Sequence, residues 1–288
     1  MSGHVLEASS PGESCAERSG RIRPSRRQPP PAPQAPSSRT TSEQQPTIAL
    51  VHGAFAESSS WNPVIEQLQA RALDVIAIGN PLRSVVGDAA YVRDVIAAIG
   101  TPVLLVAHSY GGVVITEAAA GNDAVLGLVY VAGFAPDHGE SAFQLSTMFP
   151  GSTLGDALAA YPVTTGGDEL AIKRELFHHQ FAADVPDARA ALMASTQRPA
   201  TMAALSDGLP TSIPAWKQIP SWFVFGDQDL NIPAALHRFM AERAGSQDTR
   251  ELAGVSHALS VSSPVAVAAM ILEAFDAVTA PLAAAGTK

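Results

Sequence analysis

The chain has 288 residues, of which 47 % are hydrophobic and 16 % charged, with a formal net charge of −9 at pH 7. This length is enough for one large domain with a hydrophobic core. An acidic chain without a basic stripe argues against nucleic acid as a partner. We see no apolar run long enough to span a bilayer and no apolar signal segment, so we expect no membrane partner. Cys15 is the single cysteine, which fits a reducing compartment, and we expect a soluble, cytoplasmic protein.

Both ends of the chain differ from the rest. Residues 1–46 are rich in Pro, Ser and Arg and hold six basic and four acidic residues, which leaves 12 basic and 23 acidic residues, a net charge of −11, for residues 47–288. Because residues 1–46 have almost no large apolar side chains, they cannot bury enough surface to fold, and we predict a disordered tail. We also expect residues 281–288 to be flexible.

Short, fully apolar runs alternate with amphipathic helical patterns along the first part of the chain. Helical spacing of Val92, Val95 and Ile96 predicts a helix that Asp88 caps. Apolar strands alternating with such helices are typical of a parallel sheet covered on both faces. The predicted strands, about six in all, lie at residues 47–51, 75–78, 103–107, 126–131 and 221–225, with a weaker one near 250–252.

The alternation stops between residues 136 and 215, where helix-compatible sequence with scattered prolines predominates. We therefore predict a core made of residues 47–135 and 216–280, with residues 136–215 inserted as a helical cap. In open α/β folds, ligands bind at the carboxyl edge of the sheet. We expect the cap to lie over that edge.

The segment Ala107-His108-Ser109-Tyr110-Gly111-Gly112 follows the third apolar run and precedes a helical pattern. A serine on a tight strand-to-helix turn projects its hydroxyl above the sheet, and the free N–H groups of the helix start face whatever binds there. This is the nucleophile elbow G-x-S-x-G, with Ala107 in place of the first glycine. Ser109 is thus the candidate nucleophile.

A serine hydroxyl needs a base, and the base needs an acid that fixes its tautomer. His257 lies between the last predicted strand and the final helix, and Asp229 follows the strand that ends at Phe225. Both therefore belong to loops at the same sheet edge as Ser109. The order Ser109, Asp229, His257 is that of the α/β-hydrolases.

Four segments together carry a resemblance over about residues 47–280: V-H-G-A-F, A-H-S-Y-G-G, G-D-Q-D-L-N-I-P and G-V-S-H-A. They resemble the α/β-hydrolase superfamily, and more narrowly bacterial relatives of the plant methylesterase and hydroxynitrile lyase group. The resemblance implies an α/β-hydrolase fold, with the N–H groups of Ala54 and Tyr110 as the oxyanion hole. It favours Asp229 over Asp227 as the acid, because Asp229 stands four residues before the proline. Asp137 is a further alternative.

The function expected from these residues is hydrolysis of small carboxylic esters through an acyl-enzyme on Ser109. No cofactor and no metal are expected, the partner is a small-molecule ester, and a homodimer is left open. Gly53 and Ala258 stand where the resembling lyases carry threonine and lysine, which speaks against lyase chemistry. A cofactor-free perhydrolase or haloperoxidase would share the triad, and a non-catalytic ligand-binding protein of this fold is the alternative from another class.

Several other residues have plainer interpretations. His52 and His108 are interpreted as structural, and His178-His179 as part of a solvated cap helix. Aromatic and sulfur-containing side chains near the predicted site are candidates for an apolar substrate pocket: Phe55, Trp61, Phe143 and Trp216, together with Met148, Phe149, Phe177 and Phe181.

Overall fold

The computed structural model describes residues 45–164 and 166–285. The predicted tail of residues 1–46 falls outside this range apart from its last two residues. A six-stranded sheet forms the centre, and its strands are parallel in the order β2-β1-β3-β4-β8-β9. The strands are β1 (Thr47–Val51), β2 (Val75–Ile78), β3 (Val103–His108), β4 (Val125–Val131), β8 (Ser221–Gly226) and β9 (Thr249–Leu252), which confirms the predicted sheet.

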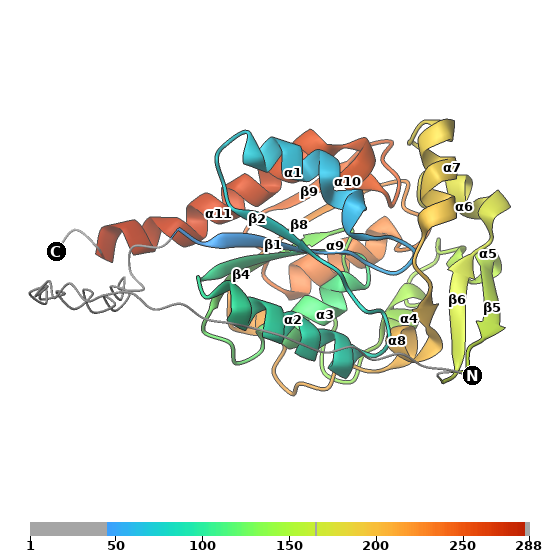
Figure 1. Ribbon diagram of the computed structural model, residues 1–288, viewed down its shortest axis with the longest axis horizontal. Helices are drawn as coiled ribbons and strands as arrows, with labels where there is room; N and C mark the ends of the chain where they lie inside the picture. Colours follow the sequence, from blue (N-terminus) through green and yellow to red (C-terminus); the bar gives the residue numbers. More distant parts are fainter. Residues whose placement is uncertain (1–44, 165, 286–288) are drawn as a thin grey trace, which may run out of the picture. The chain divides into compact units, whose positions relative to one another are not determined.

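Helices cover both faces of this sheet (Figure 1). Alternate strand residues separate into two apolar cores: Ile48 and Leu50 pack with one helix layer, Ala49 and Val51 with the other. The first layer contains α1 (Asn62–Gln69) and α11 (Pro264–Ala285), and the second contains α2 (Val85–Ile99), α3 (Gly111–Ala119) and α9 (Ala234–Arg243). Shorter turns of helix are η1 (Ser58–Trp61), η2 (Ala215–Lys217) and α10 (Leu259–Ser262).

The segment predicted as a helical cap is only partly helical. Its helices are α4 (Ala142–Ser146), α5 (Leu154–Ala157), α6 (Arg174–Phe181), α7 (Asp187–Thr196) and α8 (Met202–Ser206). It also contains an antiparallel sheet of β5 (Leu158–Pro162), β6 (Asp168–Ile172) and β7 (Ala200–Thr201). The prediction missed these strands because β5 is mostly exposed and β6 buries only Leu170 and Ile172. Such short strands lack a long apolar run.

Figure 1 shows the cap at the carboxyl edge of the central sheet. Backbone hydrogen bonds connect the cap to the loops at this edge. Phe55 N–H donates to Arg198 O at 3.0 Å, and Thr153 N–H donates to Leu230 O at 3.0 Å. The cap therefore covers the loops that carry the candidate site residues.

One smaller expectation is corrected. The cap of helix α2 is Ser84, whose side chain accepts from Gly87 N–H, whereas Asp88 lies inside the first turn. Helix α11 extends to Ala285, into the segment from residue 281 that we expect to be flexible. Among the described residues, no helix is long and apolar enough to cross a membrane.

Candidate active site

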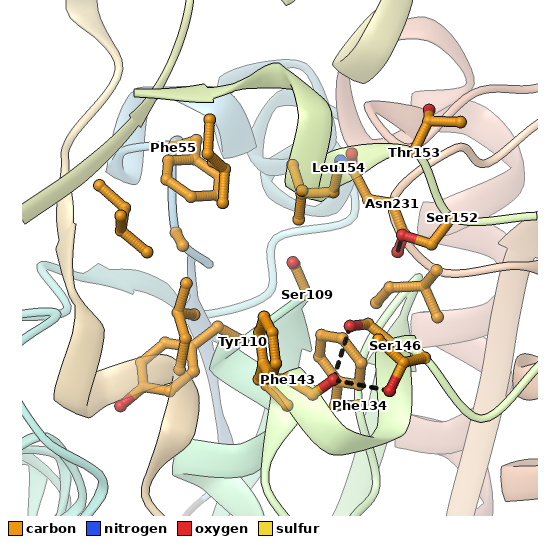
Figure 2. Close-up of a pocket in the computed structure, with 18 of the residues that line it drawn as sticks. Phe55, Ser109, Tyr110, Phe134, Phe143, Ser146, Ser152, Thr153, Leu154 and Asn231 are labelled. Carbon is orange, nitrogen blue, oxygen red and sulfur yellow. Dashed lines mark hydrogen bonds between the residues drawn. The ribbon is translucent and has the colours of Figure 1, made fainter. Parts of the chain in front are cut away.

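Ser109 occupies a strained turn between β3 and α3. Its φ angle is +55°, in the left-handed region that non-glycine residues seldom adopt. The turn is held by the Ser109 N–H, which donates to Ala132 O at 3.1 Å, and by the Ser109 carbonyl, which accepts from Gly112 N–H at 2.9 Å. Figure 2 shows the Ser109 hydroxyl projecting into a cavity between core and cap.

Glycines around the turn are required by close approach. A Cβ atom at Gly53 would lie 2.5 Å from Ser109 Cβ, and one at Gly112 would lie 2.2 Å from Phe134 O. A Cβ at Gly111 would lie 2.7 Å from Val51 O and 3.3 Å from the methyl group of Ala107, which replaces the first glycine of the elbow pattern. The small residues of this segment thus let α3 start directly against the sheet.

His257 and Asp229 form a buried hydrogen-bonded pair. His257 Nδ1–H donates to Asp229 Oδ2 at 2.6 Å, and both side chains are at most 1 % exposed. The other oxygen, Oδ1, accepts the backbone N–H groups of Asn231 at 2.8 Å and Ile232 at 2.9 Å. Burial opposes ionisation of Asp229, but attraction to His257 and the hydrogen bonds from His237 and His257 outweigh it and lower its pKa.

The alternative acids have other partners. Asp227 Oδ1 accepts from Gly254 N–H at 2.7 Å, which fixes the loop before His257. Asp137 pairs with Lys217 Nζ at 2.7 Å near the surface. Asp229 is the one of the three aspartates that contacts the His257 ring.

His108 connects the loop of His257 to the nucleophile turn. The two imidazole rings lie 4.6 Å apart between centroids, and His108 Nε2–H donates to the His257 carbonyl at 3.0 Å. Since His108 directly precedes Ser109, this contact joins the histidine loop to the nucleophile turn. Within the described part of the chain, neither Ser109 Oγ nor His257 Nε2 has a hydrogen-bond partner. Hydrogen bonds of this kind often form only when substrate is bound.

A second histidine, which the sequence did not suggest, also contacts the aspartate. His237 on α9 is buried, and its ring stacks on Phe225 with centroids 4.7 Å apart. Its Nε2–H donates to Asp229 Oδ2 at 3.4 Å, the same oxygen that His257 uses. Its distance of eight residues from Asp229 is no recognisable signal, because the contact depends on how α9 packs against β8.

The two backbone donors implied by the resemblance lie beside Ser109. Ala54 and Tyr110 both line the cavity, and among the described residues neither N–H group has an acceptor. The Tyr110 ring is fixed at its far end, where the phenol donates to Asp88 Oδ2 at 2.8 Å. Asp88 in turn accepts from Arg83 N–H at 3.0 Å, so the strand-to-helix turn is braced from the α2 side.

The cavity has a volume of about 660 Å³ and most of its wall is apolar. Phe55, Phe143 and Phe149 line it, whereas the predictions for Trp61 and Trp216 were wrong. Trp61 is fully buried in the α1–α11 core, where it packs against the edge of the His108 ring. Trp216 points away and donates to Pro136 O at 2.8 Å. Met148, Phe177 and Phe181 also lie outside the wall, and Phe181 packs edge-on against His257 at 4.9 Å.

The histidines interpreted as structural, His52 and His108, contact backbone groups, and so does His178. His52 Nδ1–H donates to Gly53 O at 2.9 Å and its Nε2 accepts from Asn80 N–H at 3.0 Å, while burial lowers its pKa to about 4. Burial also lowers the pKa of His108 to about 3. His178 contacts Val185 O at 2.8 Å. In the described residues, no group of three potential ligands could hold a metal ion.

Comparison with known proteins finds relatives that match most of the chain. A curated relative, the "Alpha/beta hydrolase nvfD" of Aspergillus novofumigatus, is 26 % identical over 250 residues, which cover 80 % of this chain and 96 % of that protein. A methylesterase, MES16, from Arabidopsis matches with a TM-score of 0.66 and 19 % identity over 80 % of this chain and 98 % of its own. A pyrethroid hydrolase from Sphingobium faniae JZ-2 matches with a TM-score of 0.63 and 21 % identity over 81 % and 98 %.

These structural similarities establish a common fold. The model of the Alpha/beta hydrolase family matches residues 48–270, which is most of the chain and includes the nucleophile turn, the acid loop and the histidine loop. The chain therefore belongs to the alpha/beta hydrolase family.

Proposed function

We propose that this protein is a serine hydrolase that cleaves carboxylic esters through an acyl-enzyme on Ser109. The observation that carries the proposal is the buried His257–Asp229 pair, joined at 2.6 Å, on a loop that His108 ties to the turn of Ser109, which has φ +55° and faces a cavity. An imidazole with a fixed tautomer that can reach a serine hydroxyl is the arrangement that makes serine nucleophilic.

In the proposed reaction, Ser109 Oγ attacks the ester carbonyl and His257 Nε2 takes the hydroxyl proton. Asp229 stabilises the imidazolium through Nδ1. The N–H groups of Ala54 and Tyr110 would stabilise the oxyanion, and loss of one such donor costs about 10²–10³ in kcat.

His257 then gives its proton to the leaving alkoxide, which departs as an alcohol. A water molecule attacks the acyl-enzyme, with His257 taking a proton from the water and returning it to Ser109 Oγ as the acid is released.

The names of similar proteins support ester chemistry over the lyase alternative. The matched structures are those of a methylesterase and a pyrethroid hydrolase. In this chain a Cβ at residue 53 would lie 3.2 Å from Ser109 Oγ and closer still to its Cβ, so the threonine of the resembling lyases would not fit without displacing the serine.

A fluorophosphonate probe and a chromogenic ester test the proposal. We expect the wild type to be labelled and Ser109→Ala not to be, and we expect Ser109→Ala or His257→Ala to lower kcat by about 10⁵–10⁶, by analogy with other serine triads. Equal labelling of wild type and Ser109→Ala would instead favour a ligand-binding protein, and a loss of only a few-fold would contradict the assigned roles.

A further inference from the structure

The hydroxyl groups in the cavity wall are already used by the protein. Ser146 Oγ–H donates to Phe143 O at 2.8 Å, Ser152 Oγ–H to Asn231 O at 3.0 Å, and Thr153 Oγ1–H to Gln180 Oε1 at 2.8 Å. Thr147 and Tyr110 likewise donate to protein oxygens. Apart from the Ser109 hydroxyl, the hydroxyls of this wall thus have no proton left to donate to a substrate.

The charge in the wall has one sign. Among the described residues that line the cavity, Asp156 on α5 is the only charged one. Asp156 is an exposed residue, and Lys173 Nζ–H, from outside the wall, donates to its backbone carbonyl at 2.9 Å. An amide, Asn231, adds a neutral polar group. Its Oδ1 accepts from Gln180 Nε2 at 2.8 Å, and its Nδ2 is buried and has no partner within residues 45–164 and 166–285. A carboxylate on a substrate would find no cation among these lining residues, because the nearby Lys173 ammonium is bound to the Asp156 carbonyl. Burying an unpaired charge is costly.

The cavity is also larger than a small ester requires. At about 660 Å³ it lies within the range of about 300–1,000 Å³ found for sites of drug-sized ligands. Figure 2 shows Phe55, Leu154, Phe143 and Phe134 around the Ser109 hydroxyl, so apolar surface surrounds the reacting atom. The expectation of a small ester is therefore revised.

We infer that the substrate is a bulky, uncharged and mainly apolar ester, and that esters carrying a carboxylate are rejected. This inference rests on the proposed function, since it concerns what Ser109 attacks. The driving force is transfer of the substrate's apolar surface from water into the cavity.

The first experiment compares 4-nitrophenyl esters with the full-length protein. Each buried methylene group contributes about fourfold, so kcat/KM is expected to rise about 10²-fold from butyrate to octanoate. A second comparison tests charge at pH 7.5. We expect kcat/KM for 4-nitrophenyl hydrogen glutarate to be at least 50-fold lower than for methyl 4-nitrophenyl glutarate, in which a methyl ester replaces the carboxylate.

Matched variants locate both effects in the cavity. Because Asp156 is exposed and its charge is screened by solvent, Asp156→Lys should raise the ratio of acid to diester turnover about fivefold. Asp187→Lys, at a 98 % exposed side chain on α7 outside the wall, should leave this ratio unchanged. Leu154→Trp should lower the octanoate-to-butyrate ratio at least fivefold, and Leu192→Trp at an exposed site on α7 is its control. If Asp156→Lys lowers the melting temperature, Asp156→Asn is measured in its place. It should also raise the ratio of acid to diester turnover, by a smaller factor.

The outcomes separate the two proposals. If no ester is turned over faster than by Ser109→Ala, the proposed function fails. If turnover depends on Ser109 but octanoate gains nothing over butyrate, or the glutarate acid reacts within threefold of its diester, the substrate class alone is overturned. Equal ratios in the Asp156→Lys and Asp187→Lys variants would likewise overturn the role of charge.

Discussion

At the scale of single residues, Asp229 uses both of its oxygens fully. Oδ1 accepts two backbone N–H groups, and Oδ2 accepts from His257 at 2.6 Å and His237 at 3.4 Å. An ionised carboxylate has about four such acceptor positions. His237 therefore takes part in stabilising the charge on Asp229, through a longer hydrogen bond than that of His257.

Replacement of His237 should change the pH dependence of kcat/KM more than it changes kcat. In His237→Phe the stacking on Phe225 is kept and the N–H donor is lost, so Asp229 becomes a stronger acceptor and holds the His257 imidazolium more firmly. A hydrogen bond is worth about 0.5–1.5 kcal/mol and one pH unit about 1.4 kcal/mol. The acidic limb of kcat/KM should therefore move up by roughly half to one pH unit, with kcat changed less than tenfold.

The control for this prediction is His237→Gln, whose side-chain N–H can again donate to Asp229. This variant should return the acidic limb of the kcat/KM profile toward its wild-type position. A His237→Phe profile that overlays the wild type would show that the contact has no electrostatic role.

Single residues of the site differ in how far sequence could reveal them. Ser109, Asp229 and His257 each directly follow a recognisable strand or lie between a strand and a helix, so topology alone places them at one edge. His237 sits inside a helix, where only the rotation of α9 against the sheet turns it toward Asp229. Trp61 and Trp216 failed as pocket residues because aromatic type and position in the chain do not determine which core a side chain enters.

At the scale of elements, the close packing of α3 on the sheet sets up the nucleophile turn. Gly112, in the first turn of α3, lies against the backbone of Phe134, so that a Cβ there would come within 2.2 Å of Phe134 O. Backbone cannot move aside as a flexible side chain can. The glycine thus fixes the distance between helix α3 and the loop that follows β4.

Gly112→Ala should therefore destabilise the protein by about 2–3 kcal/mol, the upper part of the range for overpacked sites. The matched control is Gly155→Ala in α5, where an added Cβ meets nothing within 4 Å. Urea unfolding at pH 7.5 measures both variants. Equal midpoints for the two alanine variants would contradict the close approach.

Elements differed in predictability for a physical reason. The central strands β1, β3 and β8 are buried on both faces, so they read as continuous apolar runs. In the cap, β5 is paired on one side only and has four exposed residues of five. Its sequence, Leu-Ala-Ala-Tyr-Pro, carries no strand periodicity, and its partner β6 lies beyond a turn in the chain.

At the scale of the whole molecule, buried histidines link stability to pH. His52 and His108 are enclosed where loops meet at the carboxyl edge of the sheet, and burial lowers their pKa to about 4 and about 3. In the unfolded chain a histidine has a pKa of about 6.5. As pH falls below about 6.5, the unfolded state therefore binds protons that the folded state does not, and stability is lost until the folded pKa values are reached.

Between pH 7 and pH 5 this linkage should cost about 2 kcal/mol for each of the two histidines, a large part of a typical stability of about 5–15 kcal/mol. The depressed pKa of Asp229 acts in a lower window, because its contribution is present above the unfolded pKa near 4 and is lost only as pH falls below that. Because of the two histidines, the midpoint of urea unfolding should fall steeply from pH 7 to 5.

The variant His52→Asn should reduce the slope of the urea midpoint against pH, whatever its stability at pH 7. The control His179→Gln, at an exposed position on α6, should keep the wild-type slope. A midpoint that stays constant from pH 7 to 5 would mean that His52 and His108 take up protons in the folded state, and the enclosed contacts of both rings with backbone groups would then have to open.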